Sequence, residues 1–358
     1  MPAAGSARTP RVTVFGLGGT IAMTAGGAGG VVPGLSVDQL LAAIPALAAL
    51  RTSVDVVDFR SRPGASLTFD DLEQLGAAVR QRIAEGVDGV VVTQGTDTIE
   101  ETAYLLDLRH HDAAPIVVTG AMRNPTLPGA DGPANLLAAI RVAADPVVRD
   151  LGCLVVFADE IHAAGRVRKS HSTSPATFQS PNGGPLGYVV EGRVRLLNRP
   201  TGRYRVPPPV SSTAPRVALR VVSLDDEGAA LDTPAVQLDG LVVAGFGAGH
   251  VPSGWVPPLA ALAARIPVVL ASRASGGPVL SATYGFPGSE MDLLGRGLIP
   301  AGLLDPYKAR ILLRAVLAAG ADRAQITAAF QAAAGLGDPA AWPWSPPPGT
   351  GPDPDAGR

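Results

Sequence analysis

Short apolar runs alternate along this chain with longer stretches whose apolar residues recur at helical spacing. Seven short runs, all containing valine, predict strands at 12–16, 89–93, 116–120, 153–157, 217–224, 241–245 and 268–272. Seven longer stretches predict helices at 37–50, 69–85, 99–110, 133–144, 258–265, 307–319 and 323–334. Regular alternation of strands and helices is typical of parallel sheets covered by helices, so the pattern predicts an α/β fold.

The helix expected at 69–85 has the clearest pattern. Its apolar residues fall on one face: Leu72, Leu75, Val79 and Ile83. Thr68 and Asp71 precede and open it with the spacing of a capping box. The sequence therefore predicts the start of this helix as well as its buried side.

The length of 358 residues favours two domains. Five prolines within 199–216 mark a break in composition, and we place a linker at 200–216. We expect a larger N-terminal catalytic α/β domain at 1–200, with a mainly parallel sheet flanked by helices. A smaller C-terminal α/β domain is expected at 217–336. The Pro/Gly-rich tail at 337–358 is predicted to be disordered.

The composition is that of a globular protein, 46% hydrophobic and 17% charged. With 29 basic and 31 acidic residues, the net charge of −2 gives no strong field for nucleic acid or anionic lipid. No apolar run approaches the ~20 residues of a membrane-spanning helix. The first eleven residues lack the apolar core of a signal peptide. We therefore expect a cytoplasmic protein with no nucleic-acid or membrane partner.

Few residues are available to bind a metal. The lone cysteine, Cys153, lies in an apolar run and is interpreted as a small core residue, so no internal disulfide can form. The histidines show no ligand spacing: they stand at 110, 111, 162, 171 and 250. We expect neither a metal nor a cofactor.

Lysine is scarce, since only Lys169 and Lys308 occur among the 29 basic residues. Arginine stays protonated in proteins, whereas a lysine can lose its proton when its surroundings lower its pKa. Lys308 is interpreted as an ordinary helix residue near Asp305. Lys169, in contrast, is a candidate general base, because the charges of Arg166 and Arg168 would lower its pKa.

Small and hydroxyl-bearing residues follow three of the predicted strands, at 16–22, 93–98 and 119–123. Ligands of open parallel sheets bind beyond the carboxyl ends of the strands. The first segment fails the dinucleotide pattern, because Ile21 occupies the position of the third glycine. A tight turn capped by Thr20 would explain it equally well.

Thr96 and Asp97 lie at the predicted start of a helix, where both could serve as caps. A helix start also directs backbone N–H groups outward, which suits an oxyanion. Thr96 beside Asp97 could position a water or hydroxyl nucleophile, with Lys169 as its base. Whether these residues meet is left open by the residues alone.

Two longer motifs settle the family. The chain reads Gly-Gly-Thr-Ile-Ala at 18–22 and Gly-Thr-Asp-Thr-Ile-Glu-Glu-Thr-Ala-Tyr at 95–104. Shorter motifs follow at 120–123, 130–133, 176–178 and 184–188. In this order and spacing, from about residue 11 to residue 334, the chain resembles the bacterial-type L-asparaginase family.

The resemblance implies roles for five residues of the chain. Thr20 would be the nucleophile that attacks the side-chain amide, and Thr96 with Lys169 would form its activating pair. Asp97 would act between them and also hold the substrate's α-ammonium group. Backbone N–H groups of Thr96 and Ala121 would stabilise the oxyanion, and hydrolysis of an acyl-enzyme would release aspartate and ammonia.

The resemblance also implies an assembly. Members of the family are usually tetramers built from close dimers, in which the partner's C-terminal domain completes each site. His250 and Glu290 are the candidates for that contribution to substrate binding. We thus expect a homotetramer or homodimer with shared active sites that acts on L-asparagine and possibly L-glutamine.

Two departures concern groups around the nucleophile. Many members carry a tyrosine on the loop after the first motif, and none occurs within 24–36. Tyr284 of a partner chain could substitute for it. The histidine often found before the second motif is Gln94 here.

A third departure concerns the grip on the substrate. Ser61 and Arg62 align with the serine and glutamine that bind the substrate's carboxylate and ammonium groups, and Ser66 competes with Ser61 for that assignment. An arginine beside an ammonium group is repulsive. Arg62 therefore either points away or binds the substrate's carboxylate.

Two other functions share these features. The ammonia-producing subunit of a tRNA-dependent amidotransferase has the same fold but typically carries an extra N-terminal domain, whereas the first strand here begins near residue 11. A catalytically inactive amino-acid-binding sensor is suggested by the missing loop tyrosine. Turnover of L-asparagine separates the sensor from the hydrolase.

Overall fold

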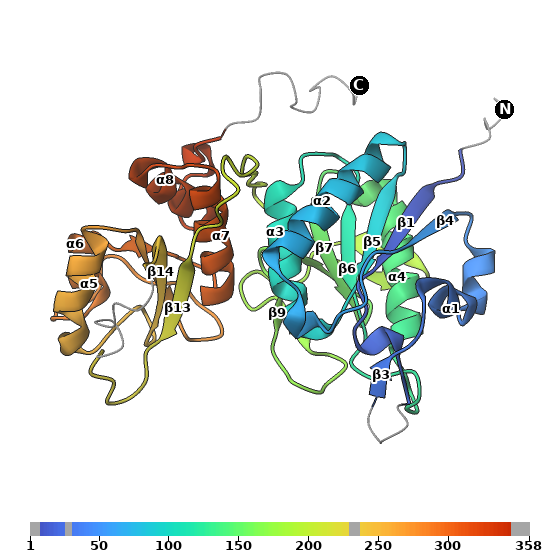
Figure 1. Cartoon of the computed structure of the whole chain (residues 1–358), viewed down its shortest axis with the longest axis horizontal. Coiled ribbons are helices and arrows are strands. Elements are labelled where there is room, and N and C mark those ends of the chain that lie inside the picture. Colours follow the sequence, from blue (N-terminus) through green and yellow to red (C-terminus); the bar gives the residue numbers. More distant parts are fainter. Residues whose placement is uncertain (1–7, 26–30, 229–236, 345–358) are drawn as a thin grey trace. The chain divides into compact units, whose positions relative to one another are not determined.

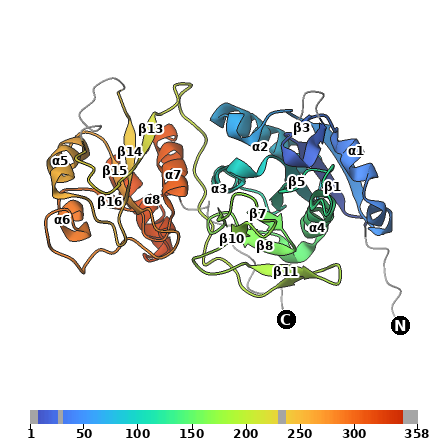
Figure 2. The ribbon, with the colours of Figure 1, turned by 90° about the horizontal axis from the view of Figure 1, so that it is seen from below.

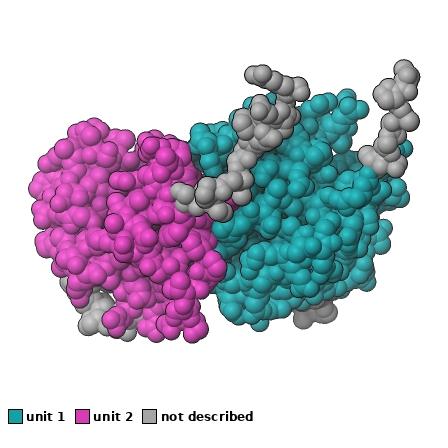
Figure 3. Space-filling view, turned by 90° about the horizontal axis from the view of Figure 1, so that it is seen from above, with its two compact units in different colours: residues 1–203, 274–277 teal, residues 204–273, 278–358 magenta. Residues whose placement is uncertain are grey.

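The computed structural model describes residues 8–25, 31–228 and 237–344. Two compact units make up the chain (Figure 3). Unit 1 is Met1–Arg203 with Ala274–Gly277, and unit 2 is Tyr204–Arg273 with Pro278–Arg358. Each unit is built around a sheet of mainly parallel strands, as the alternating pattern predicted (Figure 1).

Unit 1 contains an eight-stranded sheet with the order β12-β11-β8-β7-β6-β5-β1-β4. Its strands are β1 (Arg11–Gly16), β4 (Ser53–Asp58), β5 (Gly89–Thr93), β6 (Ile116–Thr119), β7 (Cys153–Phe157), β8 (Glu160–Ala163), β11 (Gly187–Val190) and β12 (Arg193–Leu196). Strands β4, β1, β5, β6 and β7 are parallel, and β8, β11 and β12 continue the sheet antiparallel. The carboxyl ends of the parallel strands therefore share one edge.

Helices cover both faces of this sheet. They are α1 (Val37–Ala42), α2 (Phe69–Ala84), α3 (Ile99–Arg109) and α4 (Gly132–Ala144). Side chains of α4 pack with Val91 of β5, and strand alternation turns Val90 and Val92 to the opposite face, on which α2 and α3 lie (Figure 2). Burial from both sides explains why the central strands are almost wholly apolar.

The start and end of two helices follow local chemistry. The predicted capping box of α2 is confirmed, with Thr68 accepting from the Asp71 amide and Asp71 accepting from the Thr68 amide. The single helix predicted at 37–50 is wrong in extent. The observed helix α1 ends at Ala42, and a separate 3-10 helix covers Pro45–Ala49. The α-helix stops before Pro45 because a proline cannot continue it.

Unit 2 contains four parallel strands in the order β13-β14-β15-β16. They are β13 (Val217–Val221), β14 (Gly240–Gly245), β15 (Val268–Ser272) and β16 (Ile299–Pro300). The helices of this unit are α5 (Val256–Ala263), α6 (Glu290–Gly295), α7 (Pro306–Ala318) and α8 (Arg323–Ala333). Lys308 lies fully buried in α7, where its amine pairs with Asp305 at 2.7 Å, so the interpretation as a helix residue is confirmed.

Two predicted segments differ from the structure. The proline-rich segment packs as part of unit 2, since Val206 is fully buried and the Val210 amide donates to the Ala318 carbonyl at 2.9 Å. The first residues of the expected tail are packed too, because Trp342 is buried and its indole N–H donates to the Arg205 carbonyl. The rest of the predicted tail, 345–358, lies outside the described residues.

Cys153 is buried in β7, as expected of a core residue. Across the described residues, every helix is too short or too polar to span a bilayer.

Candidate active site

Four loops meet at the carboxyl edge of the sheet in unit 1. The Leu17 amide donates to the Thr93 carbonyl at 2.9 Å, which joins the loops after β1 and β5. The Gln94 amide donates to the Thr119 carbonyl at 3.1 Å, which adds the loop after β6. The Arg62 amide donates to the Leu17 carbonyl at 3.0 Å and brings in the loop after β4. Three of these loops were expected to meet, and the fourth follows a strand that sequence reasoning missed.

Close backbone contacts fix how these loops meet. Gly19 has a φ of +88°, and a Cβ at this residue would lie 2.1 Å from the Gly95 nitrogen. No side chain fits at such a contact, so only glycine allows it. Thr20 follows Gly19, and Thr96 follows Gly95. The two threonines therefore extend from two loops whose backbones are in contact.

Thr20, Thr96 and Asp97 do not cap helices with their side chains. Thr20 opens the 3-10 helix η1 (Thr20–Ala22) after Gly19, which makes no side-chain cap bond. Thr96 and Asp97 open η4 (Thr96–Thr98), and α3 follows with no side-chain cap. The capping interpretation is wrong for all three residues, so their side chains remain available for other partners.

Lys169 meets Thr96 and Asp97. Its Nζ donates to Thr96 Oγ1 at 2.9 Å and to Asp97 Oδ1 at 2.7 Å, across more than seventy residues of sequence. Thr96 is buried and the Lys169 side chain is only 14% exposed, whereas the Asp97 side chain is 67% exposed. The hydroxyl and the amine thus lie inside the protein, and the carboxylate lies at the rim.

The two arginines near Lys169 have partners of their own. Arg168 Nε lies 3.9 Å from Glu100 Oε2, and Arg166 Nη1 donates to Asn198 Oδ1 at 2.9 Å. The Lys169 amine therefore bonds a hydroxyl and a carboxylate, while the guanidiniums of its sequence neighbours pair with Glu100 and Asn198.

A short hairpin holds Lys169 in place. Lys169 ends β9 (Arg168–Lys169), which pairs with β10 (Phe178–Gln179), and the turn between them closes on the fully buried Thr177. The Ser170 amide donates to the Thr177 carbonyl at 2.7 Å, and the His171 amide donates to Thr177 Oγ1 at 3.0 Å. The short motif at 176–178 therefore supports Lys169, a role that sequence reasoning had not assigned to it.

Two backbone N–H groups in the same loops are free to bind a ligand. Ala121 is buried, and the next two amides, of Met122 and Arg123, both donate to Asp131. Within the described part of the chain, the amides of Thr96 and Ala121 donate to no other group. They are therefore available to donate a bond to another group.

Gln94 ties two loops together. It is fully buried, and its Nε2 donates to Thr98 Oγ1 at 3.2 Å. Thr98 Oγ1 in turn donates to the Gly64 carbonyl at 3.0 Å. The glutamine therefore has a structural role behind the site.

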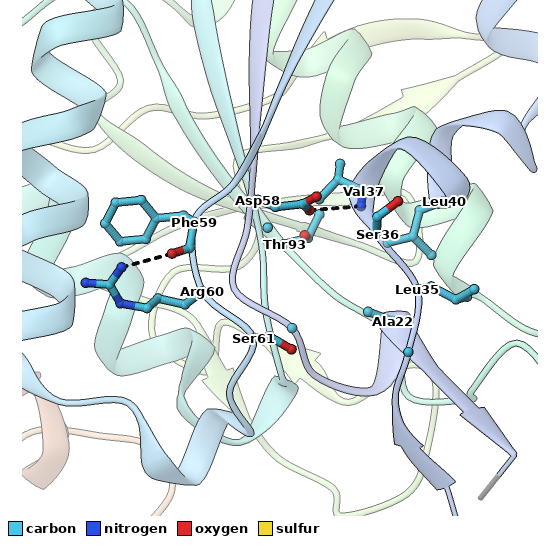
Figure 4. A pocket seen from close by; sticks show the side chains of 13 residues that line it. Ala22, Leu35, Ser36, Val37, Leu40, Asp58, Phe59, Arg60, Ser61 and Thr93 are labelled. Carbon is cyan, nitrogen blue, oxygen red and sulfur yellow. Dashed lines mark hydrogen bonds between the residues drawn. The ribbon is translucent and has the colours of Figure 1, made fainter.

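The Arg62 side chain reaches the start of α2. Its guanidinium donates to Asp71 Oδ2 at 3.0 Å. Ser61 lines a pocket of about 540 Å³ together with Gly18, Ala22 and Thr93 (Figure 4). Ser66 lies in η3 (Gly64–Ser66), outside that lining, and Thr20, Thr96, Asp97 and Lys169 are also not part of it.

His250 and Glu290 form a pair in unit 2. His250 Nε2 lies 3.2 Å from Glu290 Oε2, and the fully buried carboxylate also accepts the amides of Thr283 and Tyr284. Burial raises the pKa of Glu290, but these backbone N–H groups and His250 outweigh it and hold the pKa below the usual value. Tyr284 and Phe286 pack edge-on against the imidazole and their ring centroids lie 6.2 Å apart, so the partly exposed histidine and the two aromatic rings form one cluster.

The loop after the first motif is only partly described. Strand β2 (Met23–Ala25) pairs antiparallel with β3 (Val31–Pro33), and residues 26–30 lie outside the described residues.

Known proteins are similar to this chain in sequence and in fold. The family model "Asparaginase, N-terminal" matches residues 11–202, and "Glutaminase/Asparaginase C-terminal domain" matches residues 216–330. A probable L-asparaginase of Deinococcus radiodurans is 36% identical over 329 residues, covering 90% of this chain and 98% of that protein. A glutaminase-asparaginase of Pseudomonas aeruginosa is 33% identical over 332 residues, covering 89% and 87%. The crystal structure of a probable cytoplasmic L-asparaginase from Campylobacter jejuni superimposes with a TM-score of 0.80 at 32% identity, covering 90% and 99%.

Proposed function

Because the chain belongs to the asparaginase family, we propose that it is an amidohydrolase that converts L-asparagine to L-aspartate and ammonia. One observation carries the proposal: the Lys169 amine is bonded to both Thr96 and Asp97 beside the loop that holds Thr20. This arrangement combines a hydroxyl nucleophile, a potential base and an acidic anchor at one sheet edge.

Thr20 is the proposed nucleophile. Its Oγ1 attacks the side-chain amide carbon, and its proton passes to the activating pair. Protonation of the amide nitrogen lets the C–N bond break and ammonia leave, with the acyl group held as an ester on Thr20. Water then attacks the ester carbon, which releases aspartate and restores the hydroxyl. The contact between Gly19 and Gly95 supports this role, because it brings Thr20 to the loop of Thr96.

Thr96 and Lys169 are the proposed activating pair. In its neutral form, Lys169 accepts the hydroxyl hydrogen of Thr96 while Thr96 Oγ1 takes the proton of Thr20, a step that arginine could not perform. The resulting ammonium donates to Thr96 Oγ1, which is the direction of the bond in the structure, and the Thr96 hydroxyl then protonates the leaving nitrogen. Asp97 orients the amine through one oxygen, and its exposure leaves the other oxygen for the substrate's α-ammonium group.

The free amides of Thr96 and Ala121 are the proposed oxyanion donors. Charge develops on the amide oxygen when the carbon becomes tetrahedral, and fixed N–H groups stabilise that charge without reorganising. Ser61, which lines the neighbouring pocket, is proposed to bind the α-carboxylate and α-ammonium end of the substrate.

L-Glutamine is the proposed second substrate. The similarity to a glutaminase-asparaginase supports it, and one additional methylene changes the discrimination by only about 1–3 kcal/mol. The ratio of the two kcat/KM values measures the preference between the two substrates.

A homotetramer or homodimer is the proposed assembly, in which a partner's His250 and Glu290 complete each site. The buried, ionised Glu290 and its partly exposed histidine support a role in ligand binding rather than in core packing. Tyr284, 43% exposed beside this pair, is the proposed substitute for the absent loop tyrosine. The cytoplasm is the proposed location, and separation of cell fractions tests it.

A coupled ammonia assay with L-asparagine, L-glutamine and D-asparagine tests the function. The wild-type protein is expected to release ammonia from L-asparagine, whereas Thr20→Ala is expected to be folded and inactive. Binding of asparagine without turnover would instead favour a sensor. Co-purification with a partner chain would favour the amidotransferase subunit.

A further inference from the structure

Asp71 lies buried at the start of α2 and gathers polar groups from two directions. From its own helix start it accepts the Thr68 amide at 3.0 Å and the Thr68 hydroxyl at 2.8 Å. From the loop after β4 it accepts Arg60 Nε at 3.1 Å and Arg62 Nη1 at 3.0 Å. The first two bonds both come from the residue that caps the helix, so the arginine pair needs a separate explanation.

The carboxylate of Asp71 is fully charged at physiological pH. Hydrogen bonding from the Thr68 hydroxyl, and further bonds from the Thr68 amide and both arginines, outweigh burial and lower its pKa to about 2. Both guanidiniums therefore face a permanent negative charge. Charge-assisted hydrogen bonds are stronger than neutral ones, so they favour this direction for both side chains.

The two arginines flank Ser61 in the loop after β4. Both reach the same carboxylate, so the side chains of residues 60 and 62 lie on the same side of this loop. Figure 4 shows Arg60 reaching to one side while the Ser61 hydroxyl lies on the pocket side. Arg60 and Ser61 both line the pocket, and the bond to Asp71 draws the Arg60 guanidinium to a different side from the Ser61 hydroxyl.

The backbone of this segment lies directly against the loop that carries Thr20. The amides of Arg60 and Arg62 donate to the carbonyls of Gly16 and Leu17, both at 3.0 Å. A Cβ on Gly18 would lie 3.0 Å from both the nitrogen and the oxygen of Arg62. A change in the direction of the segment would therefore move a cationic side chain toward the catalytic loop.

We propose that Asp71 is a positioning residue for substrate binding, which presents Ser61 to the pocket and holds two guanidiniums away from the substrate's α-ammonium group. This inference rests on the asparaginase function proposed above. Asp71 touches neither the proposed nucleophile nor its activating pair, so its effect is on the bound substrate rather than on the proton transfers.

Asp71→Asn tests the proposal, because asparagine keeps the size of the side chain and removes its charge. We expect KM for L-asparagine to rise about tenfold or more while kcat stays within about threefold, the signature of lost ground-state binding. The pH dependence of kcat should not move. Adding Arg62→Gln to Asp71→Asn should lower KM again, since it removes a released positive charge.

Asp70→Asn is the matched control. Asp70 lies one residue earlier in the same first turn, is exposed, and accepts only from Gln74 among the side chains of the described chain. The Asp70→Asn substitution removes the same charge from the same end of the helix. Both kcat and KM should stay at wild-type values. A rise in KM for Asp70→Asn equal to that for Asp71→Asn would overturn the proposal, because helix charge alone would then explain it.

Hydrogen exchange of the peptide 59–67 gives a readout that needs no activity. Exchange should accelerate in Asp71→Asn and stay unchanged in Asp70→Asn. If Asp71→Asn does not fold, Arg60→Gln with Arg62→Gln frees the same segment and leaves the helix cap intact, with faster exchange and a higher KM expected. Unchanged exchange in these variants, or a fall in kcat at constant KM, would refute the positioning role. An inactive wild-type protein would refute the proposed function. The exchange comparison would still test whether Asp71 holds the segment that contains Arg60 and Arg62.

Discussion

At the scale of single residues, the proposed chemistry depends on a lysine that arginine cannot replace. The Lys169 amine lies within 2.9 Å of Thr96 Oγ1 and 2.7 Å of Asp97. Arginine would preserve the positive charge but cannot give up its proton. Lys169→Arg should therefore lower kcat by roughly 10²–10⁴, about as much as Lys169→Ala. Steady-state ammonia release measures both variants, and an active Lys169→Arg enzyme would leave Lys169 only an electrostatic role.

His162 makes stability depend on pH. It is fully buried, with Nδ1 3.0 Å from Ser180 Oγ, and burial lowers its pKa to about 4 from an ordinary value of 6.5. Above pH 6.5 the ring is neutral in both folded and unfolded chains and contributes no pH dependence. Between pH 6.5 and 4 the unfolded chain binds a proton that the folded chain refuses, so stability falls as pH falls, by on the order of 3 kcal/mol.

His162→Gln removes this titration. Urea unfolding at pH 7 and pH 4.5 should show a smaller loss of stability for the variant than for the wild type. Glu160, whose Oε2 lies 3.3 Å from the ring, opposes the effect, because burial raises its pKa and its protonation favours the fold as pH falls. The exposed His111→Gln should behave like the wild type. Equal losses in all three proteins would show that His162 does not govern the response.

Some site residues are recognisable from sequence and others are not. Thr20 and Thr96 lie in recognisable motifs, and Lys169 is noticeable because the chain contains only two lysines. The direction of Arg62 depends on Asp71, nine residues away on a helix, and no local pattern reveals that pairing. Thr177 was likewise invisible as a support, because its partners lie in a turn with no regular periodicity.

At the scale of elements, the site depends on two loops that touch through glycine. Gly19→Ala should lower activity at least about a hundredfold, because its Cβ would clash with the Gly95 backbone and move Thr20. Gly86→Ala is the control, since its φ of +89° is equally strained but no atom lies within 4 Å of the added Cβ. It should lose about 1–2 kcal/mol of stability and keep its activity. Similar activities for the two variants would show that the loop contact is unimportant.

Most strands predicted from sequence are buried on both faces, and the exception is the edge strand β13 (Val217–Val221), which was predicted to extend to residue 224. Continuous apolar runs such as Gly89–Thr93 and Cys153–Phe157 were predicted with their observed bounds. The edge strand Ser53–Asp58 was missed because aspartates interrupt its valines, and the two-residue strand Arg168–Lys169 because so short a pairing leaves no periodic signal. The missed elements are held by tertiary partners, which local sequence does not specify.

At the scale of the whole molecule, the chain divides into two α/β units, and proposed site residues occur in both. Thr20 and Lys169 belong to unit 1, whereas His250 and Glu290 belong to unit 2. The proline-rich stretch predicted to separate the units packs into unit 2 instead, since burial of Val206 depends on three-dimensional neighbours that composition does not reveal.

Mixing two inactive variants tests whether partners share active sites. Thr20→Ala and Glu290→Ala should each be inactive alone. If unit 2 of one subunit completes the site of another, dissociating and reassociating the mixture should restore activity, because some sites then receive an intact Thr20 and an intact Glu290. Reassociated Thr20→Ala alone controls for residual activity. A mixture as inactive as its components, when wild-type protein survives the same treatment, would exclude shared sites.

A double-mutant cycle on Thr96 and Lys169 tests the central claim most directly. The hydroxyl and the amine are proposed to act as one unit, and residues that act as a unit are strongly non-additive. Thr96→Val, Lys169→Met and the double variant should all show ammonia release reduced to a similar level, with the double no slower than the slower single variant by more than about threefold. Rate losses that multiply in the double variant would contradict the account, because Thr96 and Lys169 would then act independently.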